Sequence, residues 1–196
     1  MRNGLERRER ALEEAFFRKE DARAFEALRR REVERRLGLA TGLRDAETLA
    51  SLVRYGIREE TVPALVLVPL VFVAWADERT SELERLEILA QARQLGIDPR
   101  SEAHWLLEFW LKERPEPGLL EAWERYAECL AAALDLEQRE EVRREVLRHA
   151  HEVAAADGGV LRLGRRVSRP ERKMLDRLAR AFEPPSPSDK PPPTEA

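Results

Sequence analysis

The chain has 196 residues, of which 43% are hydrophobic and 37% are charged, and only 9 are glycine. This composition favours long amphipathic helices over a β protein with many turns, so we predict one all-α domain with extensions. A net charge of −3 offers no overall attraction to nucleic acid or anionic lipid, and the single cysteine, Cys129, excludes an internal disulfide.

Residues 1–38 are predicted to form a highly charged helix. Its apolar residues recur at helical spacing, as from Leu12 to Phe16 and from Phe25 to Leu28. The segment carries 12 basic and 9 acidic residues, a net charge of +3, whereas the rest of the chain carries −6. Mixed charges usually mark a solvent-exposed face, and the opposite net charges favour docking of this helix on its own body. A partner-binding arm is the alternative.

The most hydrophobic stretch runs from Pro63 to Ala76. It is shorter than the ~20 apolar residues that span a bilayer, so we predict a central buried helix, kinked at Pro69 in its interior and burying Trp75. Residues 1–8 show no apolar run after their charges and therefore no secretory signal, so a cytoplasmic location is expected.

Capping signals predict where further helices begin. Ser81–Glu84 and Ser168–Glu171 are capping boxes, in which the serine hydroxyl accepts from the third helical N–H and the glutamate reaches back to the serine N–H. Asp135–Gln138 has the same pattern. Residues 184–196 hold six of the 12 prolines and no large apolar residue, which predicts a disordered tail. Other helices are expected at 45–54, from about 59, at 99–112 and from about 119 to 130.

The two serine boxes belong to a stretch that the chain uses twice. Ala74–Asp77 and Ala154–Asp157 each end an apolar helix in an Ala-Asp corner, and a Ser-x-x-Glu-Arg helix start follows both. Aligning the two glutamates also aligns the apolar stripes of the helices that follow, which indicates an internal duplication. The second copy inserts a loop over residues 158–167.

These corners resemble the tellurite-resistance TerB-like family, whose helix pairs carry an Ala-Asp-Gly corner before a Ser-x-x-Glu helix start. The resemblance covers about residues 57–183 and implies an all-α bundle of two pseudo-repeated helix pairs. Glu78 departs from the family pattern because glycine is usual there, and glycine permits a positive φ that glutamate does not adopt freely.

The corners also provide the candidate site. If the two halves pack about a pseudo-two-fold axis, Asp77 and Asp157 approach each other, with Glu84 and Glu171 behind them. Carboxylate oxygens are the ligands that Ca²⁺ and Mg²⁺ prefer, and the family resemblance points the same way. The alternative, which we favour, is that each aspartate satisfies backbone N–H groups at its corner and each glutamate completes its capping box.

Other chemistry is sparse. His149 and His151 point to different sides of a helix, so they are not expected to share a zinc ion. We expect instead that one histidine is packed and the other is exposed to solvent. Cys129 has no activating base nearby in the sequence. The arginines in and just after the inserted loop could contact phosphate or nucleic acid, although the acidic balance opposes this and 31 of the 35 basic residues of the whole chain are arginine. These loop arginines are Arg162, Arg165, Arg166 and Arg169.

The sequence therefore predicts a charged helix at 1–38, a TerB-like helical domain at 39–183 and a disordered tail at 184–196. We expect a cytoplasmic, stress-related interaction module that binds a protein partner, with a divalent ion (Ca²⁺ or Mg²⁺) at the corners as the less favoured alternative to capping and with homo-oligomerisation left open. Nucleic acid is not expected as a partner, and an enzyme is the alternative. A hydrolase or other enzyme would need a pocket that gathers carboxylates with perturbed pKa values.

Overall fold

The computed structural model describes residues 2–156 and 167–183, with side chains from residue 18 onward. All its described secondary structure is helical, which confirms the all-α prediction. The predicted tail at 184–196 and most of the inserted loop lie outside the described residues. The elements are α1 (Arg2–Thr41), α2 (Ala46–Arg54), the 3-10 turn η1 (Glu59–Thr61), α3 (Val62–Leu65), α4 (Val68–Ala74), α5 (Glu82–Gln94), α6 (Glu102–Lys112), α7 (Pro117–Ala133), α8 (Leu136–Ala156) and α9 (Arg169–Arg180).

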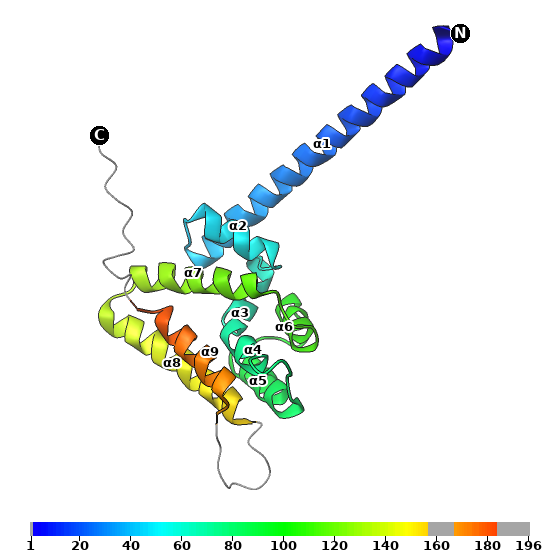
Figure 1. Ribbon diagram of the computed structural model, residues 1–196. Helices are drawn as coiled ribbons and strands as arrows, with labels where there is room; N and C mark the ends of the chain where they lie inside the picture. The colour runs from blue at the N-terminus through cyan, green and yellow to red at the C-terminus, as the bar shows by residue number, and fades with distance from the viewer. Residues whose placement is uncertain (1, 157–166, 184–196) are drawn as a thin grey trace.

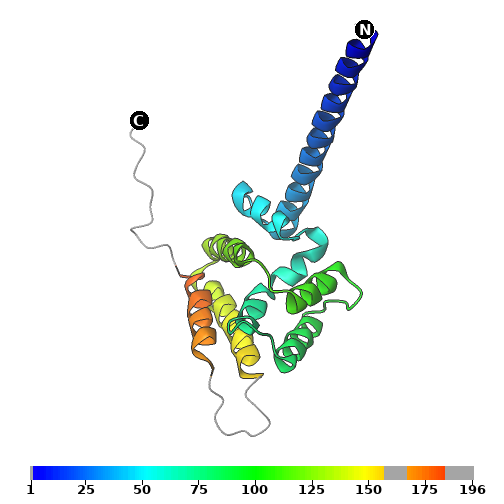
Figure 2. The ribbon, with the colours of Figure 1, turned by 45° about the vertical axis from the view of Figure 1, so that its right-hand side comes forward.

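Helix α1 projects from the body of the molecule (Figures 1 and 2). Residues 18–31 are all exposed, and α1 is anchored only near its C-terminal end, where Leu37 is fully buried. Docking on the body, which the charge balance favoured, is therefore found only toward the C-terminal end of α1, where Arg30 also donates to the Ala50 carbonyl of α2 at 3.4 Å. Farther out, α1 pairs charges within itself, as in the Arg23–Glu20 pair at 2.9 Å.

The apolar stretch 63–76 forms two short helices, not one kinked helix. Val66 and Leu67 separate α3 from α4, and Pro63 and Pro69 each lie in the first turn of a helix. A first-turn residue needs no N–H for helical bonding, so the second proline begins a helix instead of bending one. The predicted burial is confirmed, because every residue of α4 is buried.

Capping decides where the later helices begin. The Asp135–Gln138 box is present, with N···O distances of 2.8 Å from the Gln138 N–H and 3.2 Å from the Asp135 N–H. Helix α6 begins later than predicted because Ser101, and not Asp98, accepts from the third helical N–H, that of His104, at 3.2 Å. Asp98 instead accepts from the Arg100 N–H in the preceding turn at 2.8 Å.

Helix α4 lies at the centre of the core, where it packs against α5, α7, α8 and α9. Helices α8 and α9 run side by side, and α7 crosses between this pair and α2 (Figure 1). Arg177 of α9 donates two hydrogen bonds to the Glu124 carboxylate of α7, at 2.5 and 2.7 Å. The Trp123 ring meets the Phe182 ring edge-on at 6.0 Å between centroids, which closes the core beside α9.

Helices α2 and α7 approach closely at Gly118, in the first turn of α7. A Cβ atom at this position would lie 1.9 Å from the Tyr55 hydroxyl oxygen and 2.8 Å from Cζ of the same ring. Farther along the two helices, Arg125 donates to the Ser51 hydroxyl at 2.9 Å. The missing side chain at residue 118 therefore lets Tyr55, just after α2, lie directly on α7.

Candidate functional site

The two predicted serine capping boxes are both present. The Glu84 N–H lies 3.2 Å from Ser81 Oγ, and the Ser81 N–H donates to the Glu84 carboxylate at 2.8 Å. The corresponding distances at Ser168 and Glu171 are 3.2 and 2.5 Å. Both glutamates are buried, as the side chains of completed boxes should be.

The proposed four-carboxylate site is only partly visible, because Asp157 lies outside the described residues. Asp77 is exposed, and its carboxylate makes no hydrogen bond within the described part of the chain, so it does not cap its corner there as expected. Glu84 and Glu171 each bond to their own serine N–H. Among the described residues, no group of three His, Cys, Asp or Glu side chains could hold a metal ion.

Glu78, at the first corner, adopts a left-handed backbone conformation that favours glycine. Its φ is +71°, and it is the only non-glycine residue with a positive φ in the described chain. A side chain in this region costs roughly 1–2 kcal/mol because Cβ approaches the following carbonyl oxygen. The first corner therefore holds a glutamate in a conformation that strains its backbone.

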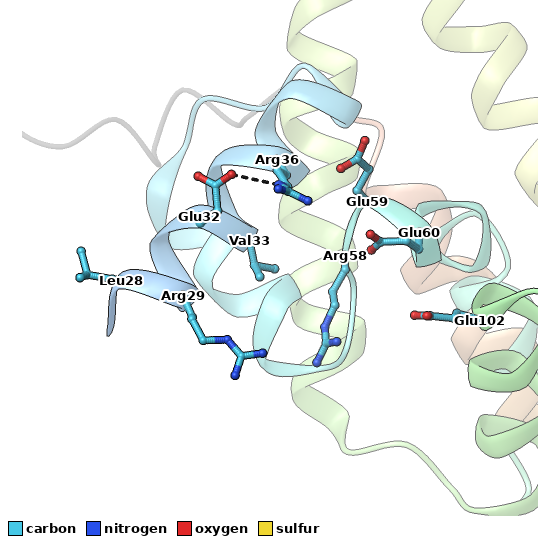
Figure 3. Close-up of a pocket in the computed structure, with 9 residues that line it drawn as sticks. All are labelled: Leu28, Arg29, Glu32, Val33, Arg36, Arg58, Glu59, Glu60 and Glu102. Carbon is cyan, nitrogen blue, oxygen red and sulfur yellow. Dashed lines mark hydrogen bonds and ion pairs between the residues drawn. The ribbon is translucent and has the colours of Figure 1, made fainter. Parts of the chain in front are cut away.

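A cleft of about 470 Å³ lies where α1 meets the body (Figure 3). Glu32 is one of the α1 residues that line the cleft. Hydrogen bonds from Arg35 and Arg36 lower the pKa of Glu32 to about 2. A carboxyl group with this pKa stays ionised at neutral pH and cannot act as a general acid. The cleft carries charges of both signs, from three arginines and four glutamates. Its lining residues are Leu28, Arg29, Glu32, Val33, Arg36, Arg58, Glu59, Glu60 and Glu102.

A second depression, of about 520 Å³, lies between α5 and α8 over the central helix α4. We name it the α5–α8 groove. Its α8 wall consists of residues spaced three or four apart, which places them on one face of that helix. Its walls are mostly apolar, and the charged side chains among them are acidic. The lining residues are Val66, Leu67, Leu70, Gln91, Leu95, Leu134, Gln138, Glu141, Val142, Glu145, Val146 and His149.

Gln91 is the buried polar residue of this groove, with 2% of its surface exposed. Its amide nitrogen donates to Glu87 at 3.0 Å and to Glu152 of α8 at 3.3 Å. Its amide oxygen is buried and has no donor within the described residues. A buried acceptor without a donor costs stability, so this oxygen is an unsatisfied group beneath the groove.

The histidines and the cysteine lie as the sequence predicts. His149 is half-buried between Glu145 and Glu152, at 3.6 and 3.4 Å, whereas His151 is exposed. Burial raises the pKa of the Cys129 thiol, which keeps it protonated at neutral pH and makes it a poor nucleophile. Of the four loop arginines, only Arg169 is described; it is exposed in the first turn of α9.

Comparison with protein families, curated proteins and solved structures finds no match to this chain. Within the described residues, no helix has the length and apolar character needed to cross a bilayer. The geometry of the chain itself must therefore indicate its function.

Sequence reasoning found the boxes but missed both the cleft and the α5–α8 groove. Each depression combines segments far apart in the chain, such as Val66 with Val146. The one usable signal was the apolar stripe on α8, whose Val142 and Val146 pack against the core and also line the groove.

Proposed function

We propose that the protein is a TerB-like helical interaction module in which α1 presents an apolar strip to a protein partner. The observation that carries this proposal is the exposure of Phe25 and Leu28, at 62% and 63%, on a helix that leaves the body. The two residues are three positions apart and share one face of α1. Large apolar side chains on a projecting helix favour helix-in-groove recognition.

The charge of α1 specifies the kind of partner. Residues 1–38 carry a net charge of +3, and Arg29, one turn from Phe25, has no ion pair within the described residues. A partner with an apolar groove bordered by carboxylates would bind both the exposed apolar side chains and the positive charge of α1. Electrostatic attraction of this kind raises the association rate and falls with added salt.

An enzyme is less well supported by the site. Catalysis by paired carboxylates requires one group whose pKa is raised enough to donate a proton. In the cleft at the base of α1 the arginines have the opposite effect, because their hydrogen bonds lower the pKa of Glu32. The two capping-box glutamates each accept a hydrogen bond from a serine backbone N–H, which is a structural role.

The proposal can be tested by replacing Phe25 with a photo-crosslinking amino acid in the full chain and irradiating cells that express it. We expect a protein adduct from position 25, to be identified by mass spectrometry. The matched control is the same replacement at Leu136, which is 76% exposed on α8 and does not line the groove. If position 25 yields no more adduct than position 136, α1 is not a partner-binding arm.

A further inference from the structure

We propose that the partner of the α1 arm is a second copy of this chain, and that its seat is the α5–α8 groove. This inference rests on the proposed function, since it assigns a partner and a site to the same arm. It makes the protein a self-associating module whose projecting helix enters the body of a neighbouring copy.

The groove has the shape and surface to accept a helix. Val66 and Leu95 rise half-exposed at its sides, and Val142 and Val146 line the α8 wall. The groove follows α8 from residue 138 to residue 149, which corresponds to roughly 17 Å at 1.5 Å per residue. Helix α1 has 40 residues, and its exposed side chains from 18 to 31 alone extend over roughly 20 Å by the same rise, so the helix is long enough to fill the groove.

The charge of the groove favours a basic occupant. Glu141 and Glu145 are exposed on the α8 wall, Glu145 with Arg148 beside it at 2.7 Å, and no lysine or arginine lines the groove. The exposed residues 18–31 of α1 include six basic and three acidic side chains. A helix that presents phenylalanine and leucine with arginine beside them matches both the apolar walls and the acidic edge, and α1 has this composition around residue 25.

The arm cannot occupy the groove of its own copy. Helix α1 rises from α2 and leads away from α4, α5 and α8 in both ribbon views (Figures 1 and 2). The exposed residues 18–31 continue the same unbroken helix that ends at Thr41. A rigid helix of this direction can meet an α5–α8 groove only on another molecule.

Self-association of the full chain, measured by sedimentation equilibrium over a concentration series, tests the inference. We expect the parent to associate and to dissociate as salt is raised. The arm variant F25E/L28E and the groove variant V66E/L95E should each weaken association about tenfold or more, as hot-spot changes do. The four side chains are between 48% and 63% exposed, so their replacement does not disrupt the core. Circular dichroism checks that each variant is folded.

Matched controls distinguish this contact from nonspecific hydrophobic association. Leu39, Leu136 and Trp105 are exposed apolar residues outside both the arm strip and the groove lining, so their replacement by glutamate should leave association unchanged. If V66E/L95E does not fold, E141R/E145R reverses the charge at exposed positions of the same wall and should have the same effect.

Mixing the variants gives the sharpest result. The arm variant keeps an intact groove and the groove variant keeps an intact arm, so the mixture should associate more strongly than either variant alone. A monomeric parent, a mixture that stays monomeric, or loss of association in W105E instead of the groove variant would each overturn the inference. A monomeric parent whose position 25 crosslinks a different protein would overturn the second copy as partner while leaving the interaction module in place.

Discussion

Helices α1 and α4 belong to one chain but are stabilised in opposite ways. Helix α1 has 40 residues, and its described side chains from 18 to 31 are all exposed. Helix α4 has 7 residues, and all of them are buried. A helix of two turns is not stable in water by itself, so α4 depends on the helices packed around it, whereas α1 depends on its length and on ion pairs along its surface. Mutations should therefore have very different effects in the two helices.

The largest difference is expected between two phenylalanines. F72A removes a buried side chain of α4 and should lower the free energy of unfolding by about 3–5 kcal/mol, because the lost ring leaves a cavity. F25A removes an exposed ring of α1 and should change it by less than about 0.5 kcal/mol. Urea denaturation of both variants at a protein concentration where the parent is monomeric measures the contrast. Equal effects would show that α1 packs like α4.

The next largest effect concerns Trp75, the residue that follows α4. The indole N–H of Trp75, which is half-buried and not fully buried as predicted, donates to the Trp110 carbonyl of α6 at 2.8 Å. That carbonyl lies in the last turn of α6, where no helical N–H follows to bond it. W75F removes the donor and should destabilise the protein by about 1–3 kcal/mol. W105F, at an exposed position of α6, is the control and should be neutral; a neutral W75F would mean that water replaces the indole.

A gain in stability is expected at the corner that follows α4. E78G removes the side chain from a residue with a φ of +71° and should raise the free energy of unfolding by roughly 1 kcal/mol. E78A keeps a Cβ at the same φ and should give no comparable gain. Thermal or urea unfolding distinguishes the two variants, and a destabilised E78G would show that the glutamate side chain holds the corner.

The smallest effect is expected from removing most of α1. Deletion of residues 2–24 should leave the melting temperature of the body unchanged at a concentration where the parent is monomeric, because the anchoring residue Leu37 remains. The helical circular dichroism signal should fall in proportion to the residues removed. A melting temperature lowered by several degrees would show that the deleted segment contacts the body.

Sequence patterns predicted the local features well because a capping box requires only residues three positions apart. The boxes at Ser81 and Ser168 formed as expected for this reason. Where two local solutions competed, the sequence did not decide: Asp98 and Ser101 could each begin α6, and Pro69 could kink a helix or start one. The choice depended on which backbone groups the surrounding core left unbonded.

Features that need distant segments could not be predicted. The opposite net charges of residues 1–38 and the rest of the chain suggested docking in cis, but net charge gives no direction, and the helix leads away from the body. The α5–α8 groove joins residues about 80 positions apart, such as Val66 and Val146. The proposed meeting of Asp77 and Asp157 stays a prediction, since Asp157 lies outside the described residues.

Gly118 also contributes to how the long helix is set on the body. Helix α1 packs on α2, and α2 is held on α7 both by the Arg125–Ser51 hydrogen bond and by Tyr55, which lies on the bare backbone at residue 118. A side chain at residue 118 would force the end of the Tyr55 ring to shift and would remove this part of the α2–α7 contact. Because α1 has 40 residues, a small change in the tilt of α2 would displace the far end of α1 by a much larger distance.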